Sequence, residues 1–205
     1  MEKKKKDLRV MRTQKLIKDA FLRLIKEKGF QTITIRDIAD EAMINRATFY
    51  LHYQDKYDLL EQMSNFYLQE LMEVMDISFH LKDGEVNVKR FKITLKNIFE
   101  NIQKNKEFYT VMLGPNGMSD FTEKIERHLF DKFKAHFGTL VEQMKLKFPT
   151  DFLLSFISSA YIGVTKWWLN EGCNYSPDFM AENLANIITK GPMNTIGYRV
   201  NFKDE

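Results

Sequence analysis

The chain has 205 residues, of which 44% are apolar and 29% are charged, a composition typical of a globular protein with a packed core. Its single cysteine excludes a disulfide within the chain and suits a reducing compartment, so we expect a cytoplasmic protein. The basic N-terminus is not followed by the apolar segment of a signal peptide. The most apolar run, residues 152–164, is shorter than the roughly 20 residues of a membrane span.

The net charge of +3 is unevenly distributed along the chain. Residues 1–60 hold 14 Lys/Arg and 9 Asp/Glu, whereas residues 61–205 hold 17 and 19. A basic N-terminal part indicates that this part meets a polyanion. The alternative is that the positive charge is unevenly distributed but only solvated by water. It stays open because four of the lysines, Lys3 to Lys6, could form an unstructured tail.

The first predicted helix ends at Gly29 and carries apolar residues at helical spacing: Leu16, Ile17, Ala20, Phe21, Leu24 and Ile25. A two-turn helix follows. Thr34 is placed to cap it, and Asp37, three residues on, completes a capping box. Ile33 and Ile38 have the spacing of a hydrophobic staple. After a tight turn at Met43 and Ile44, Asn45 is expected to cap a third helix.

This third helix begins in the stretch NRATFYLHY, residues 45–53. On a helical wheel, Phe49 and Tyr53 share the side that can pack on the first two helices. The opposite side is small, apolar or hydroxyl-bearing and consists of Ala47, Thr48, Leu51 and His52. Such a surface suits base edges, because a short side chain permits close approach and a hydroxyl or leucine can contact bases. An ordinary amphipathic helix with one exposed leucine is the alternative.

Three short helices with a tight turn between the last two are the helix-turn-helix arrangement. Asp55 is expected to cap a fourth helix, whose N-terminus forms a phosphate site together with Lys56. Arg36, in the first turn of the second helix, is expected near the edge of the DNA groove. Basic and hydroxyl groups therefore gather from three helix starts.

The run TITIRDIADEAMINRATFYLHYQDKYDLLEQM, residues 32–63, resembles the DNA-binding domain of TetR/AcrR-type transcriptional regulators. The specific part is the succession T-x-R-x-I-A, A-T-F-Y-x-H-Y and D-K-x-x-L-L at fixed spacing. The resemblance implies an all-α fold, with a helix-turn-helix domain and basic arm at 1–60 and a helical effector-binding and dimerisation domain at 61–205. The DNA-binding residues that it implies are Thr34, Arg36, Asn45, Arg46, Ala47, Thr48, Tyr50, Leu51, His52 and Lys56.

In that resemblance, Thr34 and Arg36 contact the DNA backbone, and Phe49 and Tyr53 belong to the core. The major groove receives Arg46, Ala47, Thr48 and Leu51, and the phosphates are bound by Tyr50, His52 and Lys56. The chain departs from the family at Met43, where glycine is usual. A left-handed Met43 costs roughly 1–2 kcal/mol, unless packing of its side chain offsets the strain.

The rest of the chain is predicted to be helical at residues 56 to about 78, 88–104, 120 to about 147, 151–171 and 177–190, with a loop at 81–85 and a turn at 114–117. The last two helices carry more apolar and small residues than one core needs, which favours a two-fold four-helix bundle of two copies. The expected dimer residues are Phe156, Ser159, Ala160, Gly163, Met180, Leu184, Ile187 and Ile188. Ordinary core helices are the alternative.

The run WWLNEGCNYSPDFMAENL, residues 167–184, resembles a subgroup of these C-terminal domains found in Gram-positive bacteria, in which the effector is a small molecule or a protein. Apolar side chains between the helices can line a ligand cavity. The candidates by position are Phe66, Phe91, Met112, Phe121 and Trp167, with plain core packing as the alternative.

The sequence offers no catalytic residue, metal site or cofactor motif. The histidines, at positions 52, 80, 128 and 136, lack ligand spacing, and Cys173 has no evident base. We therefore predict a homodimeric, sequence-specific transcriptional regulator, a repressor on a palindromic operator in double-stranded DNA, controlled by an effector. The alternative is a protein-interaction module or co-activator whose C-terminal domain binds a partner protein.

Overall fold

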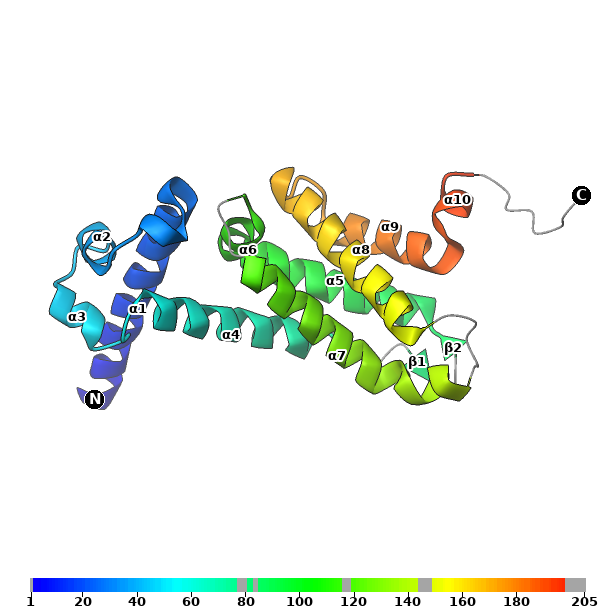
Figure 1. Ribbon diagram of the computed structural model, residues 1–205, viewed down its shortest axis with the longest axis horizontal. Helices are drawn as coiled ribbons and strands as arrows, with labels where there is room; N and C mark the ends of the chain where they lie inside the picture. The colour runs from blue at the N-terminus through cyan, green and yellow to red at the C-terminus, as the bar shows by residue number, and fades with distance from the viewer. Residues whose placement is uncertain (1, 77–80, 83–84, 116–118, 144–148, 198–205) are drawn as a thin grey trace, which may run out of the picture. The chain divides into compact units, whose positions relative to one another are not determined.

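The computed structural model describes residues 2–76, 81–82, 85–115, 119–143 and 149–197, which are helical apart from short connections and one small hairpin (Figure 1). Its elements are α1 (Glu2–Lys28), η1 (Phe30–Thr32), α2 (Ile35–Glu41), α3 (Arg46–Tyr50), α4 (Lys56–Val74), β1 (Leu81–Lys82), β2 (Glu85–Val86), α5 (Val88–Lys104), α6 (Lys106–Leu113), α7 (Ser119–Gln143), α8 (Thr150–Asn170), α9 (Pro177–Lys190) and α10 (Pro192–Thr195). Within the described residues, none of these helices could span a membrane.

Most predicted elements are present, and the differences lie at their ends. The lysine run belongs to α1 rather than to an unstructured tail. Helix α4 ends at Val74, earlier than predicted, and residues 77–80 lie outside the described part of the chain. The expected loop at 81–85 contains an antiparallel hairpin in which Leu81 pairs with Val86. Helix α6 was not predicted. Of the predicted turn at 114–117, residues 116 and 117 lie outside the described residues.

The chain forms two compact units, each built from separate segments. The first contains Met1–Gln69 and Lys106–Ile125. In it, α2 and α6 pack against α1, and α3 packs against α2. Helix α1 ends at Gly29, whose φ of 75° is the left-handed conformation that glycine adopts without strain. Helix α6 is held on α4 by Tyr67, whose ring stacks on Phe108 at 3.9 Å and whose carbonyl accepts a hydrogen bond from the Tyr109 hydroxyl at 3.1 Å.

The second unit contains Glu70–Asn105 and Glu126–Glu205. Helix α9 packs along α5, and two ion pairs at their edge join Lys92 to Glu182 at 2.6 Å and Lys96 to Asp178 at 2.8 Å. Trp168 on α8 is fully buried, and its indole N–H donates to the backbone carbonyl of Tyr175 at 2.9 Å. This bond fixes the corner between α8 and α9.

Candidate nucleic-acid interface

Helix α3 has two faces of opposite character. The helix ends at Tyr50, before the end of the predicted stretch 45–53. The inner face is closed, since Phe49 on α3 and Tyr53 just after it are 0% and 2% exposed, with ring centroids 5.7 Å apart. The ring of Tyr50 stands edge-on against Phe49 at 5.8 Å and is half-exposed. The prediction that Phe49 and Tyr53 belong to the core is confirmed.

The outer face of α3 and of the turn after it reaches solvent. Ala47 is exposed, Leu51 is 81% exposed, and Thr48 and His52 are half-buried. Arg46, at the first position of the helix, is also exposed. A short side chain, a hydroxyl and a leucine on one open surface can approach base edges closely.

Asn45 fixes the start of α3, as predicted. Its side-chain oxygen accepts a hydrogen bond from the N–H of Ala47 at 2.9 Å, and its backbone carbonyl accepts from the N–H of Thr48 at 2.8 Å. A contact between Asn45 and a DNA phosphate would come from its NH₂ group, because a phosphate only accepts hydrogen bonds.

Met43 sets the turn between α2 and α3, and its φ of 54° is left-handed. Its N–H donates to the carbonyl of Asp40 at 3.1 Å, and the N–H of Ile44 donates to the carbonyl of Ala39 at 2.9 Å. This pair of bonds is a Schellman motif, which normally has glycine at the position of Met43. The Met43 side chain is 92% exposed, so packing does not offset the strain. These backbone bonds and the buried Ala42 hold the turn.

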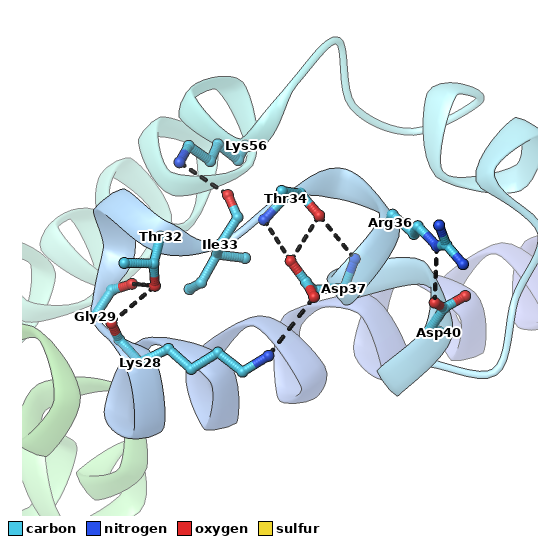
Figure 2. A network of polar contacts seen from close by, with 9 residues as sticks. All are labelled: Lys28, Gly29, Thr32, Ile33, Thr34, Arg36, Asp37, Asp40 and Lys56. Atoms are coloured by element: carbon cyan, nitrogen blue, oxygen red, sulfur yellow. Dashed lines mark hydrogen bonds and ion pairs between the residues drawn. The ribbon is translucent and has the colours of Figure 1, made fainter.

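The start of α2 carries the predicted capping box (Figure 2). The hydroxyl of Thr34 accepts from the N–H of Asp37 at 3.1 Å and donates to the Asp37 carboxylate at 2.6 Å, and the N–H of Thr34 donates to the same carboxylate at 2.8 Å. The bonds from the Thr34 hydroxyl and N–H hold the pKa of Asp37 below its ordinary value. Both donors of Thr34 are engaged in the box, so the predicted contact of Thr34 with a phosphate would have to replace one of these bonds.

Arg36, in the first turn of α2, is an accessible cation. Its side chain is 80% exposed, and its Nε lies 3.6 Å from a carboxylate oxygen of Asp40 that is also exposed (Figure 2). An ion pair this exposed contributes little to stability. Arg36 can therefore leave Asp40 for a DNA phosphate.

The ammonium of Lys56, the first residue of α4, lies against backbone carbonyls. It donates to the carbonyls of Phe30, Gln31 and Ile33 at 3.1, 3.0 and 2.9 Å, and Figure 2 shows the bond to Ile33. A lysine ammonium has three donors, and these carbonyls use all three. The sequence predicts that Lys56 binds phosphate, whereas in this structure its donors are engaged by the protein itself.

Two carboxylates occupy the N-terminus of α4. Asp55 accepts from the N–H groups of Tyr57 and Asp58, each at 2.8 Å, which confirms its predicted role as the cap. Asp58 accepts from the N–H of Gln54 at 2.8 Å, and this bond is the main cause that lowers the pKa of Asp58. At this helix start, carboxylates of the chain therefore take hydrogen bonds that an anion would otherwise accept.

The predicted pocket residues divide into two groups. Phe91, Met112 and Phe121 are buried, at 7%, 1% and 2% exposure. Phe66 and Trp167 are 49% and 46% exposed, so they face solvent rather than a cavity within the chain. The ammonium of Lys18 lies over the Phe66 ring, 5.2 Å from its centroid.

The predicted dimer residues also divide. Met180 and Leu184 are each 3% exposed and belong to the core of their own unit, which removes them from the predicted interface. The remaining six are exposed or half-buried: Phe156, Ser159, Ala160, Gly163, Ile187 and Ile188. Phe152 is 68% exposed and lies one helical turn before Phe156, so it extends this exposed apolar surface.

In the described part of the chain, no three His, Cys, Asp or Glu residues lie close enough together to hold a metal ion. In the region 34–58, Thr34, Asp37, Asn45 and Asp55 serve at helix starts, and Arg36 forms an ion pair. What this region presents to a ligand is the outer face of α3 with the guanidinium groups of Arg36 and Arg46.

Comparison with protein families gives two matches. Residues 17–63 match the family described as "Bacterial regulatory proteins, tetR family". Residues 90–190 match the family described as "Transcriptional regulator C-terminal region".

Individual relatives agree with these matches. The HTH-type transcriptional regulator YxbF of Bacillus subtilis is 28% identical over 184 residues, which are 85% of this chain and 44% of that protein. The chain thus spans less than half the length of this relative. Among solved structures, a TetR transcriptional regulator from Streptococcus agalactiae is similar with a TM-score of 0.57 and 22% identity, over 89% of this chain and 97% of that one. FadR of Bacillus subtilis in complex with stearoyl-CoA has a TM-score of 0.62 and 16% identity, over 86% and 97%.

The exposed, left-handed Met43 leads to a prediction about stability. Met43→Gly should raise the free energy of unfolding by up to about 1 kcal/mol, because it removes the steric cost of a left-handed L-residue and sacrifices no packing. Met43→Ala keeps the Cβ and should leave the stability within about 0.5 kcal/mol of the parent chain. Urea unfolding of the three proteins measures the difference. A destabilised glycine variant would show that the Met43 side chain makes stabilising interactions of its own.

Proposed function

Because the chain belongs to the TetR family of bacterial transcriptional regulators, which are DNA-binding proteins and not enzymes, we propose that it binds a palindromic operator as a homodimer and represses transcription. In this proposal, residues 1–60 contact DNA, and residues 61–205 hold the dimer together and respond to an effector. We expect it to act in the cytoplasm, where its DNA lies.

The observation that carries the proposal is the open outer face of α3 above a closed aromatic inner face. Ala47, Thr48 and Leu51 are the residues we assign to base edges, where Leu51 can contact a thymine methyl and Thr48 can form a hydrogen bond. Leu51 is 81% exposed, so its side chain contributes little to the core of this unit. Contact with DNA would remove this apolar surface from water.

Backbone contacts come from groups around this face. We assign them to Arg36, Arg46, Tyr50 and His52, all of which are exposed or half-buried. Asn45 contributes through its NH₂ group. Phosphate contacts fix the position of a recognition helix but carry no sequence information, so these residues set affinity and register.

Homodimerisation is supported by a continuous stripe along α8. Phe152, Phe156, Ser159, Gly163 and Trp167 fall on one side of the helix and are exposed. The ring of Trp167 stacks on Tyr175 at 5.5 Å, and Tyr175 stacks on Phe179 of α9 at 4.8 Å, which extends the apolar surface. A Cβ placed on Gly163 would meet no atom within 4 Å, so its own chain does not require glycine there. Close approach of a second helix would require a glycine at this position.

We propose a small apolar molecule as the effector. Met112 and Phe121 are buried apolar side chains of the first unit and are suited to an apolar ligand. The similar FadR of Bacillus subtilis was solved with stearoyl-CoA. Release of the operator by a long-chain acyl-CoA would support a small-molecule effector. Retention with every acyl-CoA tried, and release by a protein from the same cell, would favour the alternative of a partner protein.

The assignment of base and phosphate contacts predicts different effects for two variants. After selection of bound DNA fragments, Thr48→Ala should change the preference at one position in each half-site. Arg36→Met should weaken binding to all sequences alike. The negative slope of log K against log salt should become less steep by about 0.9 for each phosphate that Arg36 neutralises in the parent complex. The fragment selection measures the base preference, and fluorescence anisotropy in a salt titration measures the affinity and its salt dependence. Flat salt dependence of the parent chain, with no preferred sequence, would favour a protein-interaction module instead.

The stripe on α8 predicts that Phe156→Asp and Gly163→Leu each convert the dimer to a monomer. The first places a charge in an apolar interface, and the second blocks close approach of the partner helix. Ile93→Asp is the matched control, because Ile93 is 41% exposed on α5, outside the stripe. Sedimentation velocity measures the three. A dimer that persists in both stripe variants, or that dissociates with Ile93→Asp, places the interface elsewhere.

A further inference from the structure

The segment between α1 and α2 is tied to α4 by one side chain. Lys56 is the first residue of α4, yet its Nζ reaches back across 26 and 23 residues to the carbonyls of Phe30 and Ile33, and to that of Gln31 between them. The ammonium also lies 4.8 Å from the ring centroid of Phe30 and 5.6 Å from that of Tyr57. These two rings meet edge-to-face at 5.2 Å. The charge is therefore enclosed by carbonyls and ring faces.

The peptide unit between Ile33 and Thr34 is fixed at both of its polar ends. Its carbonyl oxygen accepts from Lys56 at 2.9 Å, and its N–H donates to the carboxylate of Asp37 at 2.8 Å (Figure 2). Thr34 is the N-cap of α2, so this peptide unit determines where α2 begins and in which direction it runs.

Helix α2 depends on such support because it has only seven residues. A helix of that length is marginal by itself in water. It packs against α3 and leads into α3 through the turn at Met43, so a change in the start of α2 also moves Arg36 and the outer face of α3.

We propose that Lys56 is a positioning residue, which clamps the start of α2 to the start of α4 and so sets how α2 and α3 meet DNA, rather than a ligand of a DNA phosphate. The inference rests on the proposed function, since it assigns a role to Lys56 in the same interface. The three carbonyls converge on one nitrogen, a geometry that a compact ammonium satisfies and a planar guanidinium does not.

Two variants of the full chain separate the clamp from a phosphate contact. Lys56→Met keeps the aliphatic stem and removes the ammonium, and Lys56→Arg keeps the charge. With a clamp, both weaken binding to the selected operator by about 10- to 100-fold, the range that removal of a hydrogen bond to a charged group gives, and both leave the salt slope near that of the parent chain. Arg36→Met is the matched control, because Arg36 makes none of these carbonyl bonds and should lower the slope.

Hydrogen exchange of the free protein gives a readout that needs no DNA. With a clamp, the amides of Thr34 and Asp37 exchange about 10- to 100-fold faster in Lys56→Met and Lys56→Arg, while Arg36→Met leaves them unchanged.

The inference is overturned if Lys56→Arg binds the operator like the parent chain, Lys56→Met lowers the salt slope by about 0.9 for each phosphate neutralised, and neither variant changes the exchange. If the parent chain itself binds DNA without sequence preference, the proposed function fails and the DNA-binding role of Lys56 fails with it. Exchange then decides whether Lys56 clamps α2.

Discussion

The packing of Phe49 and Tyr53 beneath α3 is the interaction on which the proposed interface depends. Helix α3 has five residues and cannot be stable alone. Its inner rings bury it in the first unit, while the cap of Asn45 and the backbone bonds of the Met43 turn fix its start. The outer face is then presented rigidly, which reduces the ordering that binding must supply.

Some charged side chains of this unit act inside the protein. Asp37 and Asp55 complete helix starts, and the Lys56 ammonium binds carbonyls between α1 and α2. Beside the outer face of α3, the exposed cations are the arginines at the first turns of α2 and α3, Arg36 and Arg46. The excess of positive charge in residues 1–60 therefore does not by itself identify the cations that meet DNA.

The local part of this structure was predictable from the sequence. Thr34, Asp37, Asn45 and Asp55 act within four residues of their own positions, so spacing alone identified them as caps. The role of Lys56 was not predictable, because its acceptors lie more than twenty residues away. For the same reason the helical pattern did not tell which of the apolar residues on α8 and α9 face their own core: Met180 and Leu184 do, whereas Phe156 and Trp167 do not.

The most direct test of the account is the detection of nuclear Overhauser effects between operator DNA and the methyl groups of α3 in a methyl-labelled complex. The account predicts contacts from Ala47, Thr48 and Leu51 to base protons in the major groove, including a thymine methyl at Leu51. A specific complex in which these three methyl groups show no contact with DNA, while other parts of the chain do, would contradict it.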